Sequence, residues 1–534
     1  MEVAPDAEGS AGAARVAVLA CCAAIVLAGS ADANASRGPG VRAQTARTAI
    51  AWHGCGKQLQ CARVAVPLDW NRPHGRKIRL AVIRRAASRT EQRIGSLFVN
   101  PGGPGGSVEK VREDGTALDA AGQGRFDVVG WDIRGAGAST HVRCFRREKR
   151  RAAFFDDWSI PFTAAASRRQ VGTTASLARR CGKVSGALLR HISLADTARD
   201  LDHLRRLVGD RRLTYLGISG GTLIGQTYAN IYPTRVRAMV LDGVVDPVTY
   251  TRGTEAQYVN ELSYADHAFE GFLSLCDRAG SARCALAGRG PSAATRVERL
   301  LARLRRAPMP APSATPPGPL TYGDALSAIL VDMSGGPAKW PEMATALDAA
   351  ARGDGADLAT TGRILTTVFS SPTVAPGLPA VALTCADSPS RQGPRSWHRV
   401  VRRITDVSAI YGPVISWWRW APCASWPARS ADRYTGPWNA TTRSPILVIG
   451  TTHDPNTPYA NARRSARRLG NAVLLTHDGY SHTSPLDPSS CVKRAISAYL
   501  VRLATPPRGA VCRSDRQPFD PEFGQPLGQG PPSP

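Results

Sequence analysis

The sequence predicts an α/β fold: a mostly parallel sheet with helices on both faces, interrupted by an inserted and mainly helical lid domain. Three observations support this expectation. Short apolar runs ending in glycine-rich or charged loops alternate with amphipathic stretches up to residue 246, which is typical of strand–helix units and a parallel sheet. That rhythm stops at residue 247 and resumes near residue 445. The length of 534 residues also exceeds what one minimal domain needs.

The expected strands are short runs rich in β-branched and other apolar residues. They span residues 63–67, 78–84, 96–100, 126–132, 213–217, 236–242, 445–450 and 472–476. A helix is expected at residues 197–208, where Leu201, Leu204 and Val208 recur at helical spacing. A last helix is expected at residues 491–503 and closes the fold.

Composition divides the chain into segments. Residues 1–33 indicate a signal peptide, because Arg15 precedes an apolar run and small residues follow it. Whether this segment is cleaved or stays as an anchor is left open. The remaining segments are a linker at 34–50, the two core parts at 51–246 and 431–505, the lid at 247–430 and a Pro/Gly-rich tail at 506–534. We therefore expect a protein that is secreted or associated with the cell envelope, with a tail that is poorly ordered apart from Cys512.

The cysteine content and the net charge limit the functions that this protein can have. Two of the 12 cysteines lie in the signal segment, and an even number remains, which indicates disulfides in an exported chain. Many pairings are open, and the simplest joins neighbours: 55–61, 144–181, 276–284, 385–423 and 491–512. No C-x-x-C occurs, and we expect no metal or cofactor. The net charge is +26, and the sequence contains no long basic block. This favours an arginine-rich solvated surface over an anionic partner such as a nucleic acid, an acidic envelope polymer or an anionic lipid.

The strongest local motif is G-x-S-x-G at residues 217–221, directly after an apolar strand and directly before a helix. This is the context of a nucleophile elbow, in which a serine sits on a strained strand-to-helix turn. Ser219 is therefore the expected nucleophile. A glycine-rich loop at 101–107 follows an upstream strand and fits an oxyanion hole, with backbone N–H donors expected from Gly103 and Gly220.

Asp454 and His482 are the expected acid and base, in the chain order serine, aspartate, histidine. Each follows an expected strand, and active sites collect at the carboxyl ends of parallel strands. His482 would take the proton of Ser219 while Asp454 holds the imidazole, so that an acyl-enzyme forms and water resolves it. The alternatives are Asp242 and Asp246 for the acid, and His453 and His477 for the base.

A further loop at residues 131–139 reads W-D-x-R-G-x-G-x-S. We expect a structural role for it, with Asp132 and Arg134 bracing the oxyanion loop.

Together these motifs resemble the proline-iminopeptidase-type serine exopeptidases of the α/β-hydrolase fold. Within that group the sequence is similar to the secreted tripeptidyl-aminopeptidase branch of actinobacteria, which also includes proteins known as carboxylesterases. The resemblance depends on P-G-G-P-G-G-S at 101–107, the loop at 131–139, the elbow, D-P-x-T-P at 454–458 and G-x-x-H at 479–482. It covers residues 50–512. Gly220 departs from the branch, which usually has tyrosine or another larger residue there, so a side chain beside the pocket is missing.

The resemblance implies a hydrolase core under a helical lid and the release of di- or tripeptides from free N-termini. An aminopeptidase needs an anion for the ammonium group of its substrate, and Asp387 in the lid is the candidate. Bracing of the lid near Cys385 is the alternative role for Asp387. A carboxylesterase or lipase would use the same triad, and a catalytically silent envelope-binding protein is a third hypothesis. The expected substrate is a peptide or small ester, and the oligomeric state is left open.

Overall fold

The computed structural model describes residues 49–103, 106–288, 290–370, 377–390 and 392–523. The predicted signal peptide, nearly all of the predicted linker and the end of the predicted tail lie outside these residues.

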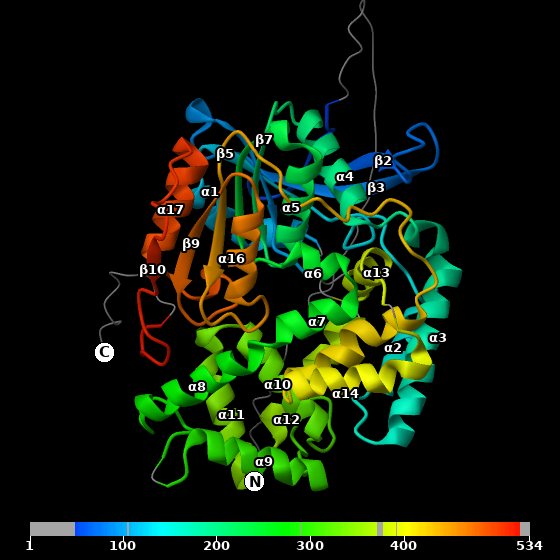
Figure 1. Ribbon diagram of the computed structural model, residues 1–534, viewed down its shortest axis with the longest axis vertical. Helices are drawn as coiled ribbons and strands as arrows, with labels where there is room; N and C mark the ends of the chain where they lie inside the picture. Colours follow the sequence, from blue (N-terminus) through cyan, green and yellow to red (C-terminus); the bar gives the residue numbers. More distant parts are fainter. Residues whose placement is uncertain (1–48, 104–105, 289, 371–376, 391, 524–534) are drawn as a thin grey trace, which may run out of the picture. The chain divides into compact units, whose positions relative to one another are not determined.

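The described residues form one ten-stranded sheet in the order β1-β2-β3-β5-β4-β6-β7-β8-β9-β10 (Figure 1). Strands β1, β2, β3 and β5 pair antiparallel, whereas the neighbours from β5 through β4 to β10 pair parallel. The strands are β1 His53–Gly56, β2 Leu59–Pro67, β3 Lys77–Arg85, β4 Gly95–Asn100, β5 Phe126–Trp131, β6 Leu213–Ile218, β7 Val236–Asp242, β8 Ile446–Thr451, β9 Ala472–Asp478 and β10 Val511–Arg513.

Successive side chains of a strand point to opposite faces of the sheet, and helices cover both of these faces. On β4, Leu97 and Val99 pack in one apolar cluster with α1 (Val108–Ala121) and α17 (Ser490–Arg502). Phe98 between them packs in the other cluster, with α4 (Leu194–Leu207), α5 (Gly220–Ile231) and α16 (Tyr459–Arg468). The predicted α/β class is therefore confirmed, with a mostly parallel sheet between helical layers.

The register brings the carboxyl ends of the central strands to one edge. Asn100 of β4 pairs with Gly217 of β6, and Ile218 of β6 pairs with Asp242 of β7. The loops after these strands therefore emerge side by side, where ligands bind in open parallel sheets.

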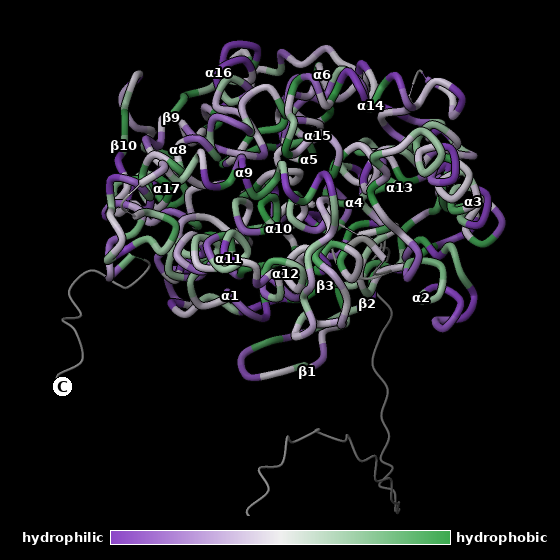
Figure 2. Tube along the Cα trace, turned by 90° about the horizontal axis from the view of Figure 1, so that it is seen from below, coloured by the Kyte–Doolittle hydropathy of each residue, from purple (hydrophilic) through white to green (hydrophobic). Residues whose placement is uncertain are grey.

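The lid consists of short helices against this edge (Figure 1). Its helices within 247–430 are α6 Pro247–Thr251, α7 Thr254–Leu262, α8 Ala265–Ala279, α9 Ala293–Arg306, α10 Tyr322–Ser334, α11 Trp340–Arg352, α12 Ala356–Ser370, α13 Leu378–Asp387, α14 Trp397–Val407 and α15 Tyr411–Ile415. Hydrophilic segments, drawn in purple, run along the outside at α2, α3, α14 and α16 (Figure 2).

Two helices that the sequence analysis did not predict join the lid from within the first core segment. They are α2 (Glu148–Asp156) and α3 (Ala164–Leu189), between β5 and β6. Trp158, just after α2, stacks on Trp418 of the lid with ring centroids 5.3 Å apart. Phe155 is the buried residue of α2, and α2 and α3 thus pack with helices of the segment that we predicted as the lid.

The described residues contain five disulfides, and all five join the neighbouring cysteines of the simplest predicted pairing. Cys491–Cys512 ties the tail to α17. Residues 511–513 also add β10 to the sheet beside β9, so this part of the tail is more structured than we expected. Across the described ranges, no helix is both long and apolar enough to cross a membrane.

Candidate active site

Ser219 lies on the sharp turn between β6 and α5. Its φ of 53° and ψ of −124° are unusual for a residue with a side chain, and its N–H donates to the Asp242 carbonyl at 2.8 Å. A Cβ at Gly217 would lie 2.7 Å from the Gly221 carbonyl oxygen, and one at Gly221 would lie 2.5 Å from that of Asn100. Both outer glycines of the motif are therefore required by close backbone packing.

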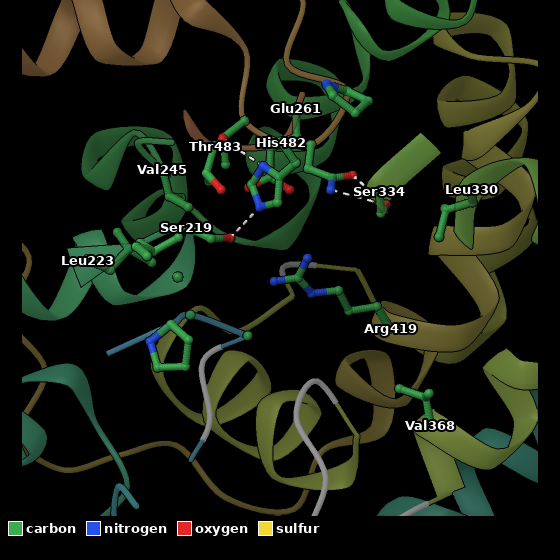
Figure 3. Close-up of a pocket in the computed structure, with 18 of the residues that line it drawn as sticks. Ser219, Leu223, Val245, Glu261, Leu330, Ser334, Val368, Arg419, His482 and Thr483 are labelled. Atoms are coloured by element: carbon green, nitrogen blue, oxygen red, sulfur yellow. Dashed lines mark hydrogen bonds between the residues drawn. The ribbon is translucent and has the colours of Figure 1, made fainter. Parts of the chain in front are cut away.

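His482 lies between this serine and Asp454, and Figure 3 shows its hydrogen bond to Ser219. The Ser219 hydroxyl lies 2.8 Å from His482 Nε2, and His482 Nδ1 lies 3.0 Å from Asp454 Oδ1. The three side chains come from loops after β6, β8 and β9. The structure thus brings the three sequence-predicted triad residues into one hydrogen-bonded chain.

Asp454 is 2% exposed and is held by its own loop. The N–H groups of Asn456 and Thr457 each donate to Oδ1 at 2.8 Å, and the Thr457 hydroxyl donates to Oδ2 at 2.6 Å. Burial lowers the pKa of His482, but the carboxylates of Asp454, Asp242 and Glu261 together, with Asp454 contributing most, hold this pKa above its ordinary value of 6.5. The pair is therefore arranged to stabilise a proton on the imidazole.

The alternative acids have other partners. Asp242 accepts hydrogen bonds from the N–H and hydroxyl of Ser484, at 3.1 and 2.6 Å, and burial raises its pKa to about 6. This carboxyl thus anchors the loop that carries His482. Asp246 forms ion pairs with Arg464 and Arg468, at 2.7 and 2.5 Å.

The alternative bases also lie elsewhere. His477 is buried beside Thr451, with 3.3 Å between Nδ1 and the hydroxyl oxygen, and burial lowers its pKa. His453 stacks on Tyr480, with ring centroids 4.1 Å apart. Among the described residues, neither imidazole forms a hydrogen bond with Ser219, so His482 is the histidine that the fold presents to the serine.

The glycine loop after β4 packs on the elbow. Gly102 and Gly103 have positive φ angles of 99° and 106°, and both line the same cavity as Gly220. A Cβ on Gly102 would lie 2.6 Å from the Ile218 carbonyl oxygen and 2.9 Å from the Gly220 nitrogen. The backbone of this loop therefore approaches the elbow as an oxyanion hole requires, with Gly102 at the closest point.

Asp132 braces this loop, as the sequence analysis expected. Its carboxylate accepts from the N–H groups of Val108 at 3.1 Å and Ala138 at 2.7 Å. Arg134 does not take part. It is buried against Asp200 of α4, with hydrogen bonds of 2.6 and 2.7 Å, so it holds a helix rather than the oxyanion loop.

A cavity of about 970 Å³ opens above the serine, a size typical of small-molecule sites. Ser219 and His482 form its sheet side, and Glu261, Leu330 and Arg419 approach from the lid (Figure 3). Within the described ranges, no group of three or more His, Cys, Asp or Glu side chains is arranged to hold a metal ion.

The sequence did not predict several charged residues that line this cavity: Glu109, Lys110 and Glu113 of α1, and Glu261 and Arg419 of the lid. Glu261, at the end of α7, is 6% exposed and accepts a hydrogen bond of 2.7 Å from Gln257. Burial raises the pKa of Glu261, while Arg419, the Gln257 hydrogen bond and His482 oppose this shift. Arg419 lines the same cavity from the end of the lid. Neither lid residue belongs to a short motif, and only the fold brings them to the serine.

Asp387 lies elsewhere. It is 1% exposed at the end of α13 and is absent from the described residues that line the cavity. Its Oδ1 is 4.0 Å from Arg433 Nε, and burial raises its pKa to about 7. The structure therefore does not place Asp387 in the lining of the cavity above Ser219, where the expected role requires it, and its position agrees with the alternative role of bracing the lid.

The sheet, the strained serine and the histidine–aspartate pair define a serine hydrolase of the α/β-hydrolase fold. Residues 95–283 match the family described as "alpha/beta hydrolase fold", and residues 408–512 match the one described as "TAP-like protein". The chain belongs to this TAP-like family of α/β-hydrolases.

The names of similar proteins state several different activities. The chain is 32% identical to "Serine protease Hip1" of Mycobacterium tuberculosis, over 85% of this chain and 87% of that protein. It is 30% identical to "Tripeptidyl aminopeptidase" of Streptomyces coelicolor, over 89% and 88%. It is 32% identical to "Carboxylesterase B" of Mycobacterium tuberculosis, over 85% and 86%. All three names are those of hydrolases, but two of them indicate peptide substrates and one indicates ester substrates.

Proposed function

We propose that this protein is an exported serine aminopeptidase that releases di- or tripeptides from free N-termini through an acyl-enzyme. Ser219 attacks the carbonyl carbon of the scissile bond while His482 Nε2 takes its proton. The same nitrogen then gives the proton to the departing amine. Asp454 keeps the imidazole oriented and stabilises its charged form. Water, deprotonated by His482, then releases the peptide from Ser219.

The negative charge that develops on the carbonyl oxygen needs donors already in place. The N–H of Gly220, at the start of α5, is the first proposed donor, where the helix dipole adds a favourable field. Gly103 is the second proposed donor, because its loop packs against the elbow through Gly102.

The observation that supports a peptide substrate is Glu261. This buried carboxylate enters the cavity from the lid, within the electrostatic reach of His482 and Arg419. A substrate ammonium group would pair with it in a site of reduced dielectric, where such a pair is stronger than in water. Glu261 therefore takes the role of amine anchor that we expected for Asp387.

The test compares a tripeptidyl-arylamide with a free N-terminus against its N-acetylated form. We expect hydrolysis of the free form only, and none after Ser219→Ala. Glu261→Gln should lower kcat/KM for the free peptide about 10- to 100-fold, since a hydrogen bond to a charged group is lost, and should leave p-nitrophenyl acetate hydrolysis nearly unchanged. Glu270→Gln, on the exposed surface of α8, is the matched control. Equal turnover of both peptide forms would contradict the aminopeptidase proposal.

A carboxylesterase is the second candidate, favoured by one side of the cavity. Leu330, Val331, Ile364, Leu365 and Val368 form an apolar lid wall, which suits an acyl chain. Serine-dependent hydrolysis of medium-chain esters, together with no turnover of either peptide form, would favour this alternative.

Export is supported by the five disulfides, which persist in oxidising compartments. Mass spectrometry of the N-terminus of the exported protein tests the predicted cleavage after residue 33. Recovery from the envelope fraction rather than the medium would favour cell-envelope association.

A further inference from the structure

Arg419 is a cavity residue that the catalytic steps do not use. It lies in a π-helical turn, Ser416–Trp420, directly after α15, and such turns are frequent at functional sites. In Figure 3 its guanidinium points from the lid into the cavity, on the side facing Ser219. The side chain therefore enters the space that a substrate would occupy.

The backbone around Arg419 is tightly packed. Trp417 and Trp420 are buried, and Trp418 stacks on Trp158. Three residues after the turn, Cys423 forms a disulfide with Cys385 of α13. This segment thus presents the guanidinium from a rigid support, as a binding group requires.

The guanidinium has no protein counter-charge at contact distance. In the part of the chain that the structure describes, no Asp or Glu oxygen lies within 4.0 Å of its nitrogens, and its buried Nε has no hydrogen-bond partner. Arg134 shows the usual arrangement for comparison, with two hydrogen bonds to Asp200 and further bonds to backbone carbonyls. A buried donor without a partner is unfavourable, so Arg419 is suited to an anion that arrives with the ligand.

We propose that Arg419 binds a carboxylate of the substrate, so that the enzyme prefers peptides carrying an acidic group near the scissile bond. This inference rests on the proposed peptidase function. A planar guanidinium can hold a carboxylate through two parallel hydrogen bonds. On the lid side of the cavity, Glu261 supplies a negative charge and Arg419 a positive one, whereas Glu109, Lys110 and Glu113 line it from α1. The two lid charges match a short peptide with an ammonium and a carboxylate group.

Two sources of the carboxylate share this chemistry. One is an Asp or Glu side chain within the released peptide, and the other is the terminal carboxylate of a short departing peptide. Tripeptidyl-arylamides with Glu or Gln at each position in turn test the first source, because their leaving group is neutral. Tetrapeptides with a free or amidated C-terminus test the second.

Each of these comparisons pairs a substrate that carries a carboxylate with the same substrate carrying an amide. For at least one pair, we expect kcat/KM to be about 10-fold or more higher for the carboxylate, as a hydrogen-bonded charge pair would give. Arg419→Gln should bring that ratio to one or below, and Arg419→Lys should retain part of it. Arg399→Gln, on the exposed surface of α14, removes the same charge outside the cavity and should leave the ratio unchanged. Calorimetric binding of the same pair to Ser219→Ala protein gives a readout independent of turnover.

The outcomes separate this inference from the proposed function. Ratios near one for every pair, or a preference that survives Arg419→Gln in a folded protein, would overturn the role of Arg419 even if peptides are cleaved. If only esters are cleaved, the peptidase proposal fails, and the comparison moves to p-nitrophenyl esters of succinate and of its monoamide. A preference for the succinate ester that Arg419→Gln removes would still support the carboxylate site, and its absence would overturn it.

Discussion

The sheet and the lid contribute to the same cavity by different means. On the sheet side, residues follow strand ends and are held by nearby backbone, as Asp454 is by the N–H groups of Asn456 and Thr457. On the lid side, Glu261 and Arg419 are positioned by the packing of helices that are distant in sequence. The sheet edge supplies the residues of the acyl-transfer reaction, which many substrates can share. The lid supplies the charges that would select among these substrates.

This comparison predicts that sheet variants abolish turnover of every substrate, whereas lid variants change the ratio between substrates. The largest effect is expected for Ser219→Ala. Removing the nucleophile should lower kcat for peptides and esters alike by about 10⁴-fold or more. Loss of peptide turnover alone, with ester turnover retained, would contradict a shared acyl-enzyme mechanism.

Asp454→Asn should lower kcat by about 10⁴-fold and should also shift the pH profile. The wild-type rate needs a neutral imidazole, so it should fall as pH drops through the pKa of His482, which lies above 6.5. In the variant, burial still lowers this pKa but the attraction of the carboxylate is gone. The acid limb of the residual kcat/KM should therefore move to lower pH. An unchanged limb would mean that another group controls it.

Gly102→Ala should lower kcat about 100-fold for both substrate classes, comparable to loss of an oxyanion donor. The new Cβ would lie 2.6 Å from the Ile218 carbonyl oxygen, and its φ of 99° disfavours a side chain. Gly172→Ala in α3 is the matched control in the lid, because its Cβ would meet nothing within 4 Å. That change should raise stability by up to about 1 kcal/mol. Full activity of Gly102→Ala would exclude close packing of this loop as a catalytic requirement.

The smallest effect is expected for Asp387→Asn, as a change in stability rather than in activity. Burial raises the pKa of Asp387 from 3.8 to about 7, so the folded state keeps a proton that the unfolded chain releases. This group therefore makes the wild type lose stability as pH rises through that interval. Asparagine does not titrate, so the variant lacks this dependence. The melting temperature of the variant minus that of the wild type should therefore rise by a few degrees as the pH increases from 3.8 to about 7. A difference that stays constant with pH would contradict this account.

The sequence by itself determined the sheet edge and its chemistry. The predicted strand at 236–242 coincides with β7, and the one at 213–217 lies within β6. Ser219, Asp454 and His482 could be predicted because each follows an apolar strand in a short motif, and the parallel arrangement then brings the strand ends together. The neighbouring cysteine pairs were the simplest of many pairings that the sequence left open, since short loops are the easiest to close, and the structure contains these five pairs.

Only the tertiary structure decided which charges of the lid line the cavity. Asp387 appeared suitable for the amine because it is an acidic residue of the lid, yet its helix turns it into the interior beside Arg433. Glu261 and Arg419 carry no motif, and α2 and α3 join the lid through contacts such as Trp158 on Trp418. The orientation of a helical side chain depends on how its helix packs against others. That packing depends on contacts between residues far apart in the chain, which local sequence patterns do not record.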